Sequence, residues 1–539
     1  RVGHNLATAG DTEVIVHLAE ELSPVELATS LEGMFAFAVW DERRRRLVLA
    51  RDRFGKKPLF WWYGAGTLVF ASEIKALFAH PAVPRLLNEH AIVPYLTFGY
   101  APTPETFYAG VHSLAPGHVL TLTSGGEPVI TEYWRPPLPP SRSSGVRSPT
   151  LPEAVSDTRE LVRTAVERRL ISDVPLGAFL SGGVDSTVVV ATMASLDRAP
   201  VQTFTVGFED DEGFDERRYA RMVARRYRTD HVEFVVRPKA IDLIEKLLWH
   251  HDQPFGDSSA IPTYLLSECT RGQVTVALSG DGGDELFAGY ERFAASLVFA
   301  NYLLLPRQVR RAVARAADRL PPASRKSRVD SIRRLLSSGD ADLLSTFANW
   351  VAYFPEPVRA EMIGSRVEGE RSLREYRAVW AGSAGQRLLA RLLDLNARTY
   401  LVDDLLVKTD RMSMAHGLEV RSPFLDHQLA DYIFRLPRSL KVPGLRLKYL
   451  LRRAFAAEIP EPILTRRKQG FAIPLDRWFR TDLHSYADSM LGPGARVREH
   501  LNPGAIDEVL ASHQSGRRNY GNGIWALLTL ELFLRRENW

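Results

Sequence analysis

Short apolar runs separated by polar turn residues dominate the first quarter of the chain. Helical spacing of apolar positions occurs there twice, at Thr12 to Leu22 and at Ser72 to Phe78. The alternation typical of strands occurs in five segments, residues 33–41, 45–55, 58–64, 67–73 and 118–134. Because turn residues separate these runs, the pattern predicts mostly antiparallel sheet.

The apolar period changes from Leu151 onward. Helical stretches at residues 151–170, 186–196 and 216–227 alternate with strand-like stretches at residues 174–180, 201–208, 231–236 and 273–280. Repeated strand–helix–strand units favour a parallel sheet with helices on both faces. Beyond Tyr290 the pattern is mainly helical. We therefore expect an α+β first domain followed by an α/β domain with a helical C-terminal part.

The stretch between these regions, residues 135–152, reads RPPLPPSRSSGVRSPTLP. It is rich in proline, serine and arginine and poor in apolar residues, which is typical of a solvated linker. The sequence thus predicts a first domain over residues 1–134 and a second over residues 153–539.

Composition narrows the class of protein. The 539 residues suffice for at least two cores, and 45% hydrophobic with 25% charged residues is typical of globular proteins. The 69 Lys and Arg are interspersed with 64 Asp and Glu, so nucleic acid is not expected as a partner. The single cysteine, Cys269, excludes an intrachain disulfide and a Cys-based zinc site. No apolar run could span a membrane, so we expect a cytoplasmic protein.

A glycine loop, LSGGVDST, lies between a predicted strand and a predicted helix. Gly182 and Gly183 would let backbone N–H groups approach phosphate oxygens at the positive end of the helix, and Ser181 and Ser186 add hydroxyl donors. Asp185 would repel a phosphate unless Mg²⁺ lies between them. The loop lacks the Gly-Lys-Ser/Thr ending of a Walker motif. The alternative is a glycine turn that merely joins strand to helix.

A second loop of similar character, LSGDGGDELFAGYERF, follows the strand that ends near Leu278. Its glycines and the acids Asp281, Asp284 and Glu285 suit a Mg²⁺-bound pyrophosphate, although a solvated acidic loop has the same composition. Both loops would meet at the carboxyl edge of one sheet, where open α/β sheets bind ligands.

Together these motifs resemble those of the glutamine-dependent asparagine synthetases, a family with a PP-loop ATP pyrophosphatase domain. FTVGFED, FDERRYARMVA, HDQPFGDSSAIPTYLLS, LLVKTDRMSMAHGLEVRSPFLDH and RRKQGFAIPLDRWF match that family in order. The resemblance covers nearly the whole chain.

The resemblance implies roles for individual residues. Asp185 and Asp284 would hold Mg²⁺, and Asp281, Lys468 and Arg411 would act in catalysis, with Asp281 standing where the family usually has glutamate. Residues of the ATP and pyrophosphate site would be Leu180, Ser181, Gly182, Gly183, Asp185, Ser186, Val206, Gly207, Ser279 and Gly280. Lys468 could instead be a solvated lysine. Lys408, Glu419 and Arg421 lie in a segment that forms the active-site wall in this family. The last two could equally form a structural ion pair.

The first domain resembles the glutaminase half of the same enzymes, an N-terminal-nucleophile amidohydrolase fold. Asp11 would bind the amino group of glutamine, although it would also pass for a helix N-cap. The family's N-terminal cysteine, RHRGPD stretch and Asn-Gly pair do not occur in this sequence. We therefore expect a missing upstream segment, an exposed sheet edge, and use of ammonia but not glutamine by these 539 residues.

The resemblance implies ATP-dependent amidation of aspartate to asparagine through a β-aspartyl-adenylate, with release of AMP and pyrophosphate. ATP and Mg²⁺ would be the cofactors, glutamine or ammonia the nitrogen source, and a homodimer a possible assembly. The alternatives are an amidotransferase acting on another carboxylate, a β-lactam-forming relative, and a non-catalytic nucleotide-binding homologue.

Overall fold

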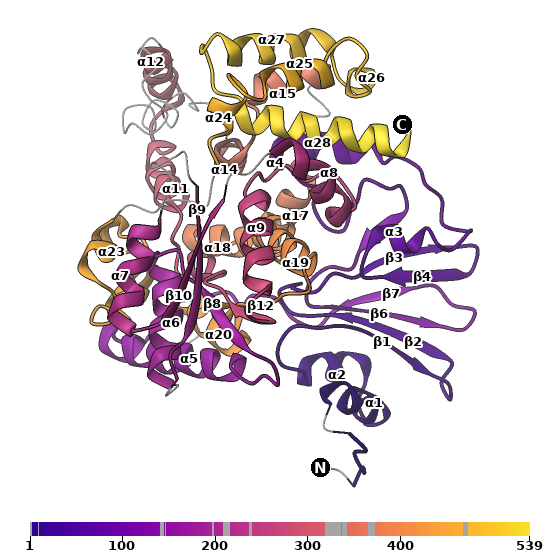
Figure 1. Cartoon of the computed structure of the whole chain (residues 1–539), viewed down its shortest axis with the longest axis vertical. Coiled ribbons are helices and arrows are strands. Elements are labelled where there is room, and N and C mark those ends of the chain that lie inside the picture. The colour runs from indigo at the N-terminus through magenta and orange to yellow at the C-terminus, as the bar shows by residue number, and fades with distance from the viewer. Residues whose placement is uncertain are drawn as a thin grey trace.

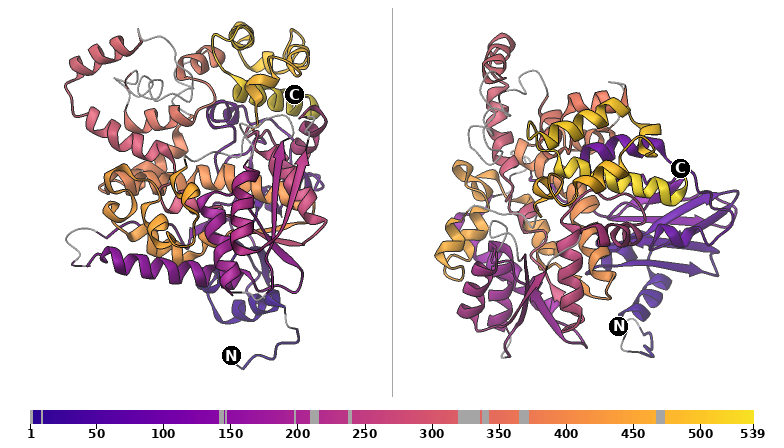
Figure 2. Two further views of the ribbon diagram at one scale, coloured as in Figure 1. Left: turned by 60° about the vertical axis from the view of Figure 1, so that its left-hand side comes forward. Right: turned by 45° about the horizontal axis from the view of Figure 1, so that its top comes forward.

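The computed structural model describes residues 3–8, 10–140, 145, 147–196, 199–208, 216–236, 240–318, 336, 342–364, 372–466 and 473–539. The N-terminal sheets lie beside a larger α/β and helical body (Figures 1 and 2). Among the described residues, no helix is long and apolar enough to cross a membrane.

Two antiparallel sheets form the first domain, as the alternation predicted. One has the order β1 (Ala36–Asp41), β2 (Arg46–Arg51), β6 (His118–Thr123) and β7 (Val129–Glu132). The other has the order β4 (Thr67–Ala71), β3 (Phe60–Gly64) and β5 (Val111–Ser113). Within the described part of the chain β1 pairs only with β2, and its Trp40 is 50% exposed.

Four helices accompany these sheets. They are α1 (Asp11–Glu21), α2 (Pro24–Ser30), α3 (Ile74–Leu77) and α4 (Ile92–Phe98). The sequence analysis missed α2 and α4. The Ser23 hydroxyl and the Glu26 carboxylate cap α2 reciprocally, a short signal that lies within one turn. Every residue of α4 is buried, so it has no polar face to reveal a helical period.

The second domain contains the predicted parallel sheet. Its order is β10 (Asp230–Val236), β9 (Gln202–Phe208), β8 (Leu176–Phe179), β11 (Val276–Leu278) and β12 (Glu419–Arg421). The connecting helices are α5 (Leu151–Arg169), α6 (Val184–Leu196), α7 (Arg217–Tyr227), α8 (Ala240–His251) and α9 (Ala260–Arg271). From β8 the chain runs outward through β9 to β10 and returns to β11 on the other side of β8. Right-handed crossovers therefore place α6 and α7 on one face and α9 on the other (Figure 1).

The rest of the chain is mainly helical, as predicted. Its helices are α10 (Gly283–Leu286), α11 (Glu291–Tyr302), α12 (Arg307–Asp318), α14 (Leu343–Val351), α15 (Glu356–Ile363), α17 (Arg374–Gly382), α18 (Leu388–Arg398), α19 (Val407–Met414), α20 (His427–Arg435), α21 (Arg438–Lys441), α22 (Tyr449–Ala454), α23 (Glu461–Thr465), α24 (Leu475–Trp478), α25 (His484–Met490), α26 (Val497–His500), α27 (Pro503–Gln514) and α28 (Gly521–Glu537). Single turns occur at η1 (Glu89–Ala91), η5 (Pro423–Leu425) and η6 (Pro443–Leu445), and η4 (Leu401–Leu406) is a π-helix.

A segment of the N-terminal region packs into this helical body. The Tyr95 hydroxyl on α4 donates to the Ala526 carbonyl of α28 at 2.8 Å. Backbone hydrogen bonds join Gly256 N to Gly99 O at 2.7 Å and Tyr353 N to Thr97 O at 3.0 Å. The two halves therefore share a buried interface in addition to the linker.

Candidate active site

The topology creates a crevice between β8 and β11. These strands are neighbours, but the chain leaves them toward opposite sides of the sheet, which is the switch point where open α/β sheets bind ligands. The loop after β8 carries Ser181 to Ser186, and the loop after β11 carries Ser279 to Asp284. The two predicted loops are thus brought together.

Close contact between the two loops depends on glycine. A Cβ at Gly283 would lie 2.5 Å from the Asp185 carboxylate, and one at Gly280 would lie 2.9 Å from the Asp185 Cβ. These two glycines therefore let the acidic loop approach the phosphate-type loop. Gly182 has φ +66°, which L side chains adopt only with strain, and a Cβ there would lie 2.5 Å from the backbone of Tyr219 on α7.

A cavity of about 1730 Å³ opens over both loops. The predicted site residues that line it are Leu180, Ser181, Gly183, Asp185, Ser186, Val206, Ser279, Gly280, Asp281 and Asp284. Pockets for a single drug-sized ligand span roughly 300–1,000 Å³. The cavity therefore has room for a nucleotide together with a second small molecule.

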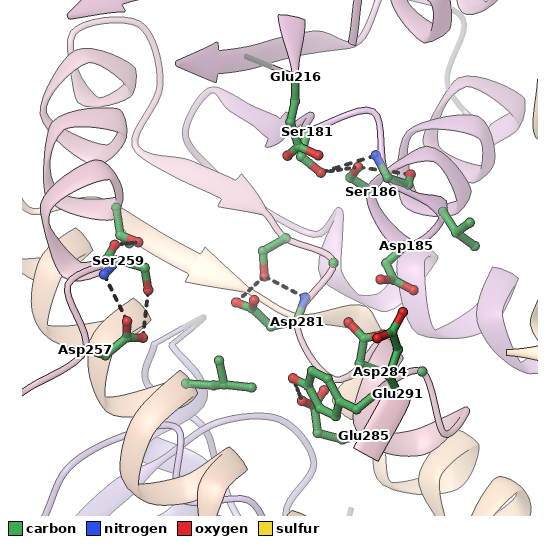
Figure 3. A pocket seen from close by; sticks show the side chains of 18 of the residues that line it. Ser181, Asp185, Ser186, Glu216, Asp257, Ser259, Asp281, Asp284, Glu285 and Glu291 are labelled. Carbon is green, nitrogen blue, oxygen red and sulfur yellow. Dashed lines mark hydrogen bonds between the residues drawn. The ribbon is translucent and has the colours of Figure 1, made fainter. Parts of the chain in front are cut away.

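The loop after β8 presents hydroxyl and N–H groups at the start of α6. The Ser181 and Ser186 hydroxyls lie 3.1 Å apart, and Gly183 N donates to Ser181 Oγ at 3.3 Å (Figure 3). The positive end of the 13-residue helix α6 points at the same place. These groups suit an anion such as a phosphate chain.

A lysine that the sequence analysis missed lies between the two predicted metal-binding acids. Lys448 Nζ is 2.7 Å from Asp284 Oδ1 and also forms an ion pair with Asp185. Burial alone would lower the pKa of Lys448, but the charges of Asp185 and Asp284 raise it. The two carboxylates therefore converge on a single cation, as a Mg²⁺ site requires, and hard oxygen donors suit that ion.

In the sequence Lys448 had no distinguishing signal. It stands in LRLKYLLRR, where it looks like one cation of a basic helix. Its backbone has φ 52°, an uncommon conformation for lysine, immediately before α22. A Cβ at Gly289 would collide with Asp284 and Lys448. The turn at Lys448 and the glycine at position 289 therefore let the ammonium reach the cavity.

A second lysine with acidic partners lines another part of the cavity. Lys408 Nζ is 2.6 Å from Asp257 Oδ2, 2.7 Å from Ser259 Oγ and 4.0 Å from Asp404. Burial raises the pKa of Asp257, but Lys408 outweighs it and holds that pKa at about 2. Burial and the neighbouring Asp257 raise the pKa of Asp404 well above its usual range. Asp404 belongs to the π-helix η4, a distortion frequent at functional sites.

Asp281 lies between these two clusters in Figure 3. Its Oδ2 accepts hydrogen bonds from Ser279 Oγ at 2.9 Å and from Thr409 Oγ1 at 3.2 Å. The carboxylate is therefore held by one hydroxyl from its own loop and one from α19.

The remaining predicted residues lie elsewhere. Gly182 and Gly207 are not among the described residues that line the cavity. Asp11 begins the exposed helix α1, with Gly10 as its N-cap. Lys468 lies outside the described residues. Arg411 is also absent from the described lining of the large cavity, and its guanidinium donates to Ser72 O of the first domain at 3.0 Å.

Glu419 and Arg421 form the structural ion pair that was one of two alternatives. Arg421 Nε donates to Glu419 Oε1 at 2.6 Å, and its Nη1 donates to the carbonyls of Arg169 and Ile171. Both residues belong to β12, whose three residues were too few to show a strand pattern. The thiol of Cys269 is partly buried on α9, and burial raises its pKa.

Comparisons with known proteins agree with this architecture. The family model described as asparagine synthase matches residues 157–535, and the glutamine amidotransferase domain model matches residues 1–134. The chain is 32% identical to a putative glutamine-hydrolysing asparagine synthetase of Mycobacterium tuberculosis, over 98% of this chain and 80% of that protein. It is 29% identical to asparagine synthetase 1 of Bacillus subtilis, over 98% of this chain and 81% of that protein. It is also 29% identical to amidase chyE of Penicillium rubens, over 88% of this chain and 74% of that protein.

Proposed function

The chain belongs to the asparagine synthase family, and from that premise we propose that it converts aspartate to asparagine with consumption of ATP. The observation that carries the proposal is the convergence of the Asp185 and Asp284 carboxylates on one cation, beside the hydroxyls and N–H groups of the loop after β8. That arrangement suits a polyphosphate neutralised by cations.

ATP would bind with its phosphates over the loop after β8. Ser181, Ser186 and Gly183 N would donate to phosphate oxygens, and Val206, a buried residue of β9 that lines the cavity, would face the adenine. Asp185 and Asp284 would hold Mg²⁺, which supplies charge neutralisation for the pyrophosphate when bound. The Lys448 ammonium would remain beside the phosphates as a fixed positive charge.

The reaction we propose is attack of the aspartate β-carboxylate on the α-phosphorus of ATP. It yields an acyl-adenylate and pyrophosphate, and ammonia then attacks the acyl carbon, which releases AMP. A carboxylate is a poor electrophile, and adenylation gives it a leaving group. Asp281 lies between the two lysine clusters, and so between the site proposed for the phosphates and the site proposed for aspartate. We therefore place it beside the reacting β-carboxylate, where it would help to position that group for attack.

The cluster of Lys408, Asp257 and Ser259 suits the amino-acid end of the substrate. It offers a buried ammonium and an ionised carboxylate within 2.6 Å of each other, which complement the α-carboxylate and α-ammonium of aspartate. The neutral form of Asp404, favoured by its raised pKa, limits the negative charge of the cluster. This supports an α-amino acid as the carboxylate substrate.

A small cavity of about 40 Å³ lies between the two domains. Arg51, Lys56 and Phe60 of the first domain and His251, Asp403 and Arg411 of the second are among its lining residues. One liquid water occupies about 30 Å³, so the space suits a molecule of that size, and ammonia is one. We infer that ammonia released in the first domain would pass through this space toward the synthetase site, with Arg411 at the wall.

The test supplies ATP, Mg²⁺ and ammonium with aspartate, glutamate or no amino acid. We expect asparagine, AMP and pyrophosphate in equal amounts, and only with aspartate. Formation of ADP and phosphate would refute the adenylation chemistry, and amidation of another carboxylate would reassign the substrate. Nucleotide binding without turnover would favour the non-catalytic alternative.

A further inference from the structure

A chain of hydrogen bonds leads from the first domain into the active-site cavity. Lys56 Nζ donates to Ser422 Oγ at 2.7 Å, the Ser422 and Ser279 hydroxyls lie 3.1 Å apart, and Ser279 Oγ donates to Asp281 Oδ2 at 2.9 Å. Lys56 belongs to the loop after β2, whereas the other three residues belong to the parallel-sheet domain. The chain therefore crosses the domain interface.

The groups at the two ends of this chain fix which atom donates in each hydrogen bond. An ammonium can only donate, and a carboxylate can only accept. Because the single Ser279 proton goes to Asp281, the Ser422 hydroxyl must donate to Ser279. All three hydrogen bonds then point from Lys56 toward Asp281, so each polarises the next.

The groups of the chain are shielded from water. Lys56, Ser422 and Ser279 are exposed by only 8%, 2% and 4%. Burial lowers the pKa of Lys56 to about 8, and the negative charge of Asp281 is the largest effect that opposes this shift. The other charged groups acting on Lys56 are Lys57 and Asp52 of its own loop and Arg169 at the end of α5.

The loop that carries Lys56 is held rigidly. The buried Asp52 carboxylate accepts hydrogen bonds from the backbone N–H groups of Phe54, Lys56 and Lys57. Arg51 donates to the carbonyls of Gly55 and Lys57 at 2.9 and 2.8 Å. Its ammonium also donates to Val420 O at 3.3 Å, and within the described residues no carboxylate bonds to it directly. Burying a charge in this way costs free energy, which a domain contact alone would not require.

We propose that Lys56 is a positioning residue for the adenylating reaction, acting across the domain interface through Ser422 and Ser279 to orient the Asp281 carboxylate. This rests on the proposed function, since Asp281 is assigned there to the reacting carboxylate. The first domain then contributes to synthesis as well as to nitrogen supply. The shorter Asp281, where the family usually has glutamate, is held at its place by this chain and by Thr409.

Aspartate-dependent exchange of pyrophosphate into ATP measures the adenylating reaction without ammonia or glutamine. We expect Lys56→Met to lower the maximal exchange rate about tenfold with little change in KM for ATP, and Lys56→Arg to restore part of it. Lys57→Met is the matched control, because Lys57 is the next residue and forms its own interdomain ion pair with Asp410 at 2.9 Å. It should stay within about twofold of wild type.

The pH dependence of the exchange rate shows whether Lys56 acts through its charge or only through packing. The wild-type exchange rate should fall as pH rises through about 8, where Lys56 loses its charge, and Lys56→Arg should move that fall to higher pH. Lys408 and Lys448 have raised pKa values and keep their charge in this range. Equal losses in Lys56→Met and Lys57→Met, or an unchanged profile in Lys56→Arg, would overturn the proposal.

Absence of exchange in the wild-type protein would refute the proposed function. Thermal unfolding would then test whether the hydrogen bonds from Lys56 to Asp281 act as one unit. We expect the midpoint shifts of Lys56→Met and Ser279→Ala to be non-additive in the double variant, because both interrupt one hydrogen-bonded chain. Strictly additive shifts would show that the two residues do not communicate.

Discussion

Three buried lysines of the second domain differ in the groups that surround their ammonium ions. Lys448 lies between Asp185 and Asp284, and Lys408 lies between Asp257 and Asp404. Among the residues that the structure describes, Lys441 donates only to the carbonyls of Ile433 and Phe434. Burial lowers the pKa of all three, but the carboxylates reverse the effect for Lys448 and Lys408. The pKa of Lys441 falls to about 7.

This difference agrees with the active-site roles proposed for Lys448 and Lys408 and with a structural role for Lys441. Lys441 is at the end of α21 and binds the last carbonyls of α20, the usual role of a cation at a helix C-terminus. The other two line the large cavity with paired acids. The two acids beside Lys408 also differ from each other, because the pKa of Asp404 lies well above its usual range whereas that of Asp257 is about 2.

The largest effect should come from removing the charge of one acid beside Lys448. We expect Asp185→Asn or Asp284→Asn to reduce pyrophosphate exchange by about 100-fold or more, since each removes a hard oxygen ligand without changing side-chain volume. Circular dichroism should show an intact fold. Wild-type exchange in both variants would contradict the assignment of these acids to the metal.

The next effect concerns Lys448 itself. Lys448→Met should lower kcat by about 10- to 100-fold and raise KM for ATP much less, because a fixed charge near the phosphates acts mainly in the transition state. The same measurement on Lys468→Ala tests the residue proposed from the sequence. If Lys468→Ala lowers kcat and Lys448→Met does not, the geometric assignment is wrong.

A third prediction distinguishes the two acids beside Lys408. Asp257→Asn should raise KM for aspartate about tenfold, because it removes the ionised partner of a buried ammonium. Asp404→Asn should change it less than about threefold, since burial and Asp257 raise the pKa of Asp404 and so favour the neutral carboxyl that asparagine mimics. Equal effects of the two substitutions would show that both acids are ionised.

The smallest effect is the pH dependence of stability due to Lys441. Its pKa is about 7 in the folded protein and 10.5 when unperturbed, so between these values the unfolded chain binds more protons. Stability from this group therefore rises with pH across that window, by at most about 1.4 kcal/mol per unit. Thermal midpoints of wild type and Lys441→Met should diverge in favour of wild type as pH rises from 7 to 9, by about 1–2 °C. Parallel midpoints would place a charged Lys441 in the folded state.

Local patterns predicted the two loops because each directly follows an apolar strand. The same reasoning could not find Lys448 or Lys56, whose partners lie far away in the chain and whose neighbours in sequence resemble an ordinary basic surface. It missed β12 because three residues show no period, and α4 because a fully buried helix has no polar face. Such features depend on tertiary contacts that one-dimensional patterns do not contain.

The central claim is that aspartate is adenylated at the crevice between β8 and β11. Its most direct test uses aspartate labelled with ¹⁸O in the β-carboxylate, together with ATP, Mg²⁺ and ammonium, followed by mass spectrometry of the phosphate-containing products. Adenylation transfers one labelled oxygen to AMP and none to pyrophosphate. Unlabelled AMP, or label in inorganic phosphate released with ADP, would contradict the account.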